Sequence, residues 1–173
     1  RRLRNALLGC MAALAMPVAA QSFDNWTIDK VRSSEGVSVL VHPSGAVMMI
    51  ANGAGSPDAA YDKLSDAMDT PCAGLRAAKR HDDGRPYGEV TGPQVHCALA
   101  THALPGGDRA VSVAILAPLS VNMALPEITR RYAAAVAEQF SASANSAATA
   151  AVDGRQSPTP TTPAPVTAST PSV

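Results

Sequence analysis

The segment from Ser141 to Val173 most limits what this chain can fold into. It consists mostly of alanine, serine, threonine and proline, and it has no aromatic residue. Its five prolines oppose regular helix and strand. The segment also offers too little apolar surface for burial to offset the conformational entropy that it would lose on ordering. We therefore predict a disordered, partly extended tail over 141–173. A single domain over 21–140 is then left, which is an ordinary size for one domain.

The first twenty residues have the pattern of a secretory signal peptide. Three arginines precede an apolar run from Ala6 to Ala15, and small residues before Gln21 suit a leader peptidase. Cleavage after Ala20 predicts a periplasmic or secreted protein. Lipoprotein processing at Cys10 is the alternative, but it leaves too short an apolar core. The run is also shorter than the roughly 20 residues of a spanning helix, so we predict no membrane span.

The charge left after removal of the leader argues against nucleic acid as a partner. Three of the 14 basic residues lie in the leader, so 11 basic residues remain beside 14 acidic ones, a formal charge of −3. Binding to nucleic acid needs a basic surface, and so does electrostatic attachment to an anionic membrane. Export also disfavours reactions that use ATP or nicotinamide, since these are mostly intracellular, and we predict no cofactor.

Apolar runs separated by short turns predict an antiparallel sheet. Turn residues at Pro43-Ser44-Gly45 and at Pro105-Gly106-Gly107-Asp108 separate pairs of such runs. The expected strands cover 26–32, 37–42, 46–51, 95–104 and 110–117.

Capping residues predict where the helices begin. Ser56 before a proline starts a helix over about 57–68, and Thr70 before Pro71 starts a second one over 71–80. The polar stretch 81–92 is predicted as a loop, and a last helix covers 127–140. The order β-β-β-α-α-β-β-α predicts the α+β class, a two-layer arrangement of about five antiparallel strands with helices on one face.

Cys72 and Cys97 are the cysteines that remain after the leader, and we predict that they form a disulfide. On a strand over 95–104, Cys97 faces the core side, against which the helix starting near Cys72 packs. The bridge closes a loop of about 25 residues, which the chain-entropy model values at roughly 3 kcal/mol. The alternative is a reactive thiol at Cys72, whose pKa a helix N-terminus would lower.

The histidines do not form a metal-binding pattern. His96 and His102 share the strand face opposite Cys97, but six residues place their Cα atoms about 20 Å apart. His42 and His81 lie in turns or loops without ligands at suitable spacing. We therefore predict no metal site.

No motif supplies a catalytic set. Gly53-Ala54-Gly55 lies between a strand and a helix, as in phosphate-binding loops, but Asp58 opposes an anion there. The hydrolase pattern Gly-x-Ser-x-Gly does not occur, and Asp82-Asp83 is typical of solvated carboxylates. We predict no catalytic and no cofactor-binding residues.

These features favour a small exported binding or accessory protein. Its expected partner is a protein or a small molecule outside the cytoplasm. One alternative is an exported enzyme, either a hydrolase with scattered residues or a thiol-dependent redox protein that uses Cys72. The other is a structural component of an envelope assembly.

Overall fold

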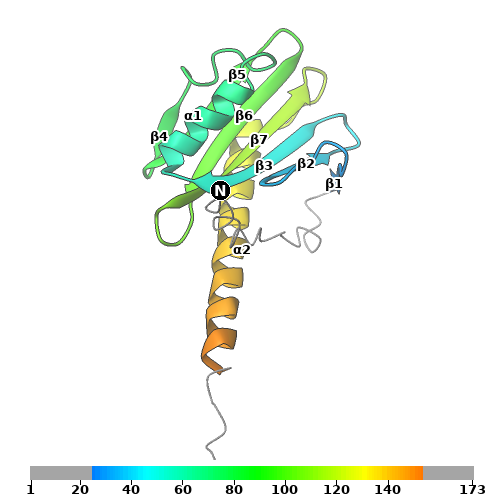
Figure 1. Cartoon of the computed structure of the whole chain (residues 1–173). Coiled ribbons are helices and arrows are strands. Elements are labelled where there is room, and N and C mark those ends of the chain that lie inside the picture. Colours follow the sequence, from blue (N-terminus) through cyan, green and yellow to red (C-terminus); the bar gives the residue numbers. More distant parts are fainter. Residues whose placement is uncertain (1–24, 154–173) are drawn as a thin grey trace, which may run out of the picture. The chain divides into compact units, whose positions relative to one another are not determined.

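The computed structural model describes residues 25–153, with side chains up to residue 144. These residues form one antiparallel sheet of seven strands in the spatial order β1-β2-β3-β7-β6-β5-β4, and two helices (Figure 1). The elements along the chain are β1 (Thr27–Ile28), β2 (Val37–Val41), β3 (Val47–Ala54), α1 (Pro57–Ala67), β4 (Arg80–Asp82), β5 (Arg85–Thr91), β6 (Val95–Ala103), β7 (Arg109–Pro118) and α2 (Leu125–Asp153). Each half of the sheet is a meander, and the pairing of β3 with β7 joins the two halves.

The central strands send alternate side chains to the two faces of the sheet, and each face is covered by one helix. The first face holds Met48, Ile50, Ala98, Ala100, Val111, Val113 and Ile115, packed with Tyr132, Ala133, Val136 and Ala137 of α2. The second face holds Cys97, Leu99 and Ala114, packed with Tyr61, Met68 and Leu75 from α1 and the segment after it. Helices on both faces explain why the middle residues of β6 and β7 are buried on both sides of the sheet.

The predicted class is confirmed: the domain is α+β, built on an antiparallel sheet. Two details differ from the prediction. The described residues contain seven strands instead of about five, and the helices lie on opposite faces instead of one. The first strand is also shorter than predicted, because the Asp29 side chain accepts hydrogen bonds from the backbone of Val31 and Arg32 and turns the chain.

The second predicted helix, over 71–80, is wrong. The backbone from Met68 to Lys79 forms successive turns, such as the bond from the Cys72 N–H to the Met68 carbonyl. Gly74 has φ +87°, a left-handed conformation that interrupts a right-handed helix. The cap-and-proline signal at Thr70 and Pro71 therefore marks a turn.

The loop predicted over 81–92 is also wrong, because β4 and β5 form a hairpin there. The two connecting residues, Asp83 and Gly84, have φ +49° and +72°. Positive φ at both positions is the type I′ turn that matches the twist of paired strands. The hairpin extends the sheet beyond β6 and creates its edge at β4.

The helix α2 continues to Asp153, beyond its predicted end at residue 140. Its distal part is rich in alanine, the residue with the highest helix propensity. The described residues up to Ser141 belong to one compact unit and those from Ala142 to another, and the site described below lies in the first. The predicted signal peptide and the proline-rich part of the predicted tail lie outside the described residues. Among the helices described, none has the length and apolar character needed to cross a membrane.

Candidate functional site

A cavity of about 300 Å³ lies between the β4–β5–β6 end of the sheet and the first turns of α2, and we call it the α2 pocket. Its lining residues are Asp82, Arg85, Pro86, Tyr87, Ala100, Thr101, His102, Glu127, Arg130, Arg131 and Ala134. The four contributed by α2 recur at intervals of three, one and three residues, so they share one face of the helix. Three guanidinium groups thus meet two carboxylates around one small cavity.

Strand pairing places the polar groups of β5 and β6 on the pocket side. Tyr87 pairs with Ala100, and the same antiparallel register, continued by two residues, sets Arg85 opposite His102. Since Arg85 and Tyr87 are two residues apart, they face the same side of the strand. Ala100 belongs to the core shared with α2, which identifies that side as the α2 face.

Arg130 is held in place by two partners. Its Nη1 lies 3.0 Å from Oδ2 of Asp82, and its guanidinium carbon lies 4.9 Å from the centre of the Tyr87 ring. A guanidinium over an aromatic face is attracted by the ring electrons, and its flat shape suits this position. These two contacts of Arg130 join α2 to the β4–β5 hairpin. One of them pairs the Asp82 carboxylate with a guanidinium.

His102 is half-buried beside a positive charge. Burial lowers the pKa of its imidazole, the charge of Arg85 lowers this pKa further, and the charge of Glu138 opposes both effects. The neutral imidazole is therefore favoured at neutral pH. Within the described part of the chain, Arg85 forms no hydrogen bond or ion pair with a carboxylate.

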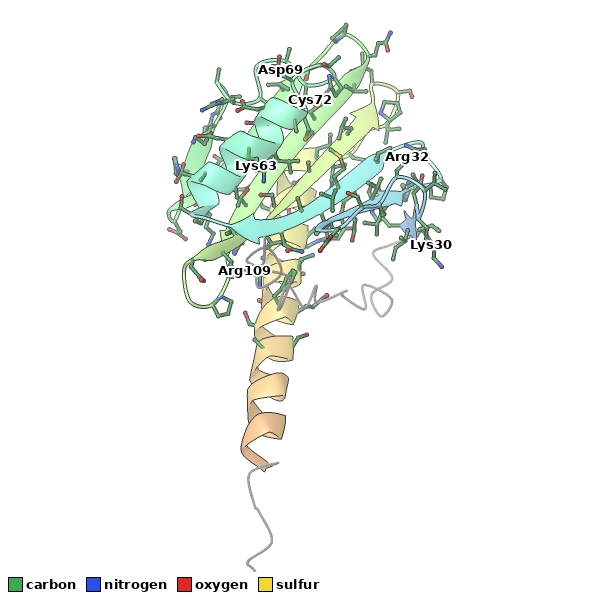
Figure 2. All side chains as sticks on the ribbon, viewed as in Figure 1. Lys30, Arg32, Lys63, Asp69, Cys72 and Arg109 are labelled. Carbon is green, nitrogen blue, oxygen red and sulfur yellow. A yellow bond between two sulfur atoms is a disulfide. The ribbon has the colours of Figure 1, made fainter. Side chains whose placement is uncertain are left out.

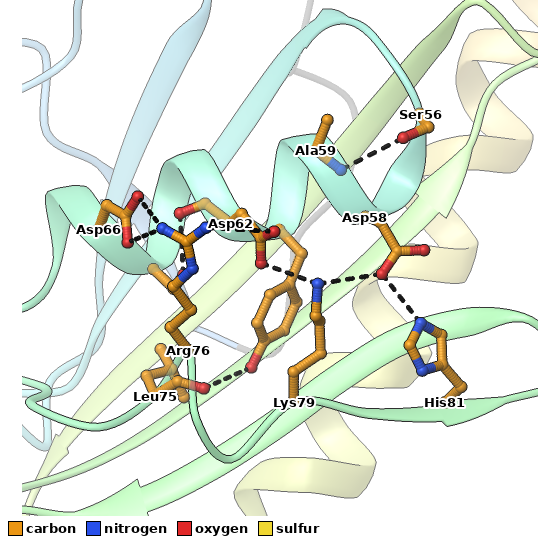
Figure 3. Close-up of polar contacts among 11 residues, drawn as sticks. Ser56, Asp58, Ala59, Asp62, Asp66, Leu75, Arg76, Lys79 and His81 are labelled. Carbon is orange, nitrogen blue, oxygen red and sulfur yellow. Dashed lines mark hydrogen bonds and ion pairs between the residues drawn. The ribbon is translucent and has the colours of Figure 1, made fainter.

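A second polar cluster lies on the other face of the sheet and fastens α1 to the chain that follows it (Figure 3). Lys79 Nζ lies 2.8 Å from Asp62 Oδ1 and 3.1 Å from Asp58 Oδ1, and His81 Nε2 lies 2.9 Å from Asp58 Oδ1. Hydrogen bonds from His81 and Lys79 lower the pKa of the Asp58 carboxyl. These side chains are partly exposed, between 21% and 49%, and they pair with one another, so the cluster positions the segment before β4.

The two cysteines are bonded to each other within the core on the α1 face of the sheet. Cys72 follows the C-terminal end of α1 (Figure 2), and its Cα lies 5.9 Å from that of Cys97 in β6. Their exposed fractions are 0% and 1%. Both sulfur atoms are buried in a bond, so this arrangement gives no support to a reactive thiol at Cys72.

The other residues considered from the sequence lie apart. His42 contacts Ser44 and the ring of Trp26, and His96 bonds to Thr91. Among the residues that the structure describes, no three histidine, cysteine, aspartate or glutamate side chains are close enough to hold a metal ion.

The Gly53-Ala54-Gly55 connection does not have a free amide for a phosphate at Gly55. The Gly55 N–H donates to the Asp108 carbonyl at 2.8 Å, and Asp58 lies in the first turn of α1. The connection links β3 to α1, and the Asp58 carboxylate opposes an anion at this helix start.

The α2 pocket was not predicted from the sequence. Arg85 and Tyr87 lie on the β4–β5 hairpin, within the segment that the sequence predicts as a loop, and the Asp83-Gly84 pair is the sequence signal for such a hairpin. Fold and pocket together define an α+β domain with an arginine-lined cavity between its sheet and its C-terminal helix. No family model, no curated protein and no solved structure matches this chain.

Proposed function

We propose that this is a small exported binding or accessory protein that takes a small polar ligand in the α2 pocket. The observation that carries the proposal is the convergence of three arginines, His102 and Tyr87 on one cavity of about 300 Å³. Ligand sites are concave, have volumes from about 300 Å³ upward, and combine an apolar body with a few placed polar groups. Pro86, Ala100 and Ala134 supply the apolar part of this lining.

The groups in the pocket suit binding better than catalysis. Guanidinium groups donate hydrogen bonds and keep their charge throughout the physiological range. Thr101 also borders the cavity, but its side chain points to the α1 face with those of Cys97 and Leu99, and its hydroxyl is bonded to Ser112 Oγ at 2.9 Å. The carboxylate of Asp82 is paired with Arg130, so neither group is available as a nucleophile or base.

The buried disulfide is consistent with an oxidising location outside the cytoplasm. Together with the predicted leader, it supports a periplasmic or secreted protein. The expected ligand is therefore one that occurs in the cell envelope or the medium.

A filled pocket tests this proposal. Ala134→Trp places the largest side chain in the cavity, and Ala67→Trp, at an exposed position of α1, is the matched control. We would screen anionic, neutral and cationic small molecules by ligand-observed NMR at one ionic strength. At least one class should bind the wild type and the control but not Ala134→Trp. A screen without binders, or binding that persists in Ala134→Trp, would reject the pocket as the site.

A further inference from the structure

We infer that the α2 pocket recognises an oxyanion group, with Arg85 and His102 as its two anchors. This inference rests on the proposed function and names the class of ligand. The group is either a free inorganic oxyanion or the acidic end of a small organic acid. Both present the same oxygen atoms to a guanidinium and an imidazole.

Its position beside His102 singles out Arg85 among the lining arginines, because the register of β5 on β6 sets the two residues opposite each other and the charge of Arg85 acts on the imidazole. Arg130 is neutralised by Asp82 and lies on Tyr87, so its donors are partly used. Arg85 is the lining arginine beside His102, and within the described residues it has no carboxylate partner. Guanidinium groups bind oxyanions through paired N–H donors, and this one faces a cavity without such a partner.

His102 complements Arg85 because an anion between them would accept hydrogen bonds from both side chains. The charges that act on His102 are those of Arg85 from β5 and Glu138 from α2. Asp82 from β4 and Glu127, Arg130 and Arg131 from α2 line the same cavity. Without a ligand, burial and Arg85 lower the pKa of His102. An anion at this point counters the charge of Arg85, favours the imidazolium and gains a second donor. Binding should therefore be accompanied by proton uptake and should tighten as pH falls.

The test follows the four described histidines of the full-length protein by NMR. Their imidazole signals would be titrated with pH in sodium chloride and in sodium sulfate at matched ionic strength. Sulfate should raise the titration midpoint of His102 by about 1 pH unit, the effect of an opposite charge at about 4–6 Å. His42, His81 and His96 do not line the α2 pocket, so they are the internal controls.

Two variants separate specific binding from general salt effects. Arg85→Gln should raise the midpoint of His102 in chloride, because a positive neighbour is lost, and should abolish the further rise in sulfate. Arg32→Gln removes an exposed arginine that pairs with Asp29, and it should leave the response to sulfate unchanged. An equal shift of all four histidines, or a sulfate response that persists in Arg85→Gln, would overturn the inference.

Succinate, tested in the same way, distinguishes the two sources of the oxyanion. A response to succinate but not to sulfate indicates an organic acid, and equal responses indicate a free oxyanion. A third outcome is that neither sulfate nor succinate shifts His102, while a neutral or cationic molecule binds the wild type but not Ala134→Trp. The oxyanion assignment then fails, and the proposed binding function stands. If no class binds in either experiment, both fail.

Discussion

Gly88 in β5 lies against the hydroxyl group of Tyr61, so replacing it by alanine probes how closely α1 packs on the sheet. A Cβ atom at Gly88 would overlap the Tyr61 hydroxyl and lie 3.1 Å from the carbonyl oxygen of Ala78. Tyr61 is completely buried, and its hydroxyl donates to the Leu75 carbonyl at 2.9 Å, so it has little freedom to move. The φ angle of Gly88 is not positive, and the backbone itself accepts alanine. We expect Gly88→Ala to cost about 1–3 kcal/mol from overpacking.

Removing the obstructing hydroxyl should lower this penalty. Tyr61→Phe alone should cost about 1–2 kcal/mol, because the Leu75 carbonyl loses its donor in a buried place. In that background, the new methyl group of Gly88→Ala no longer overlaps the Tyr61 hydroxyl, and the next nearest atoms are those of the Ala78 carbonyl. Its cost should then fall below about 1 kcal/mol. The double variant should therefore be more stable than the sum of the single losses predicts, by about 1–2 kcal/mol.

Urea denaturation of the wild type, both single variants and the double variant measures this coupling. Gly53→Ala in β3 is the matched control, since its Cβ would have no heavy atom within 4 Å and its φ is also not positive. It should leave stability unchanged or raise it by about 0.4–1 kcal/mol. Losses that add within about 0.5 kcal/mol, or a Gly88→Ala variant as stable as Gly53→Ala, would refute the contact.

Three further predictions use other parts of the molecule. Replacing Cys72 and Cys97 together by alanine should cost about 3 kcal/mol in oxidising buffer, because the bridge spans a sequence separation of 25; each single replacement should cost nearly as much, and small additive losses would contradict the bond. Burial, with a smaller effect of the Asp62 charge, raises the pKa of Tyr61 from 10.0 to about 12. The free energy of unfolding should therefore fall as pH rises through this interval. In a pH titration followed by phenolate absorbance, the component that is absent from Tyr61→Phe should have its midpoint near the upper value. If the predicted leader is cleaved after Ala20, intact-mass measurement of the protein made in an exporting host should show a chain that begins at Gln21, and an acylated chain would contradict this cleavage.

Local signals in the sequence were sufficient for the centre of the sheet. The apolar runs 37–42, 46–51, 95–104 and 110–117 correspond to β2, β3, β6 and β7 within a few residues. Ser56 caps α1 as expected, accepting a hydrogen bond from the Ala59 N–H. In these segments the turn residues, the apolar periodicity and the caps all favour the same structure.

The wrong predictions arose where one local signal favours two structures. A threonine followed by proline begins either a helix or a turn, and the left-handed conformation of Gly74 decides for a turn. The number of helical layers depends on long-range packing. The middle residues of β6 and β7 are mostly apolar on both sides because a helix covers each face of the sheet. This pattern in the sequence indicates helices on both faces and contradicts the prediction of helices on one face only.

The contrast between the disulfide and the α2 pocket shows which tertiary features a single sequence can predict. Cys72 and Cys97 are the two cysteines of this sequence outside the predicted leader, so the sequence points to this pair without any knowledge of the fold. Each arginine has many possible carboxylate and aromatic partners, and the fold alone determines which of these it meets. Arg85 reaches His102 only through the register of β5 on β6, and Arg130 reaches Asp82 only because α2 lies across the same hairpin. Because the turn at Asp83-Gly84 was predicted as part of a loop, the β4–β5 hairpin and the α2 pocket that it lines were not predicted either.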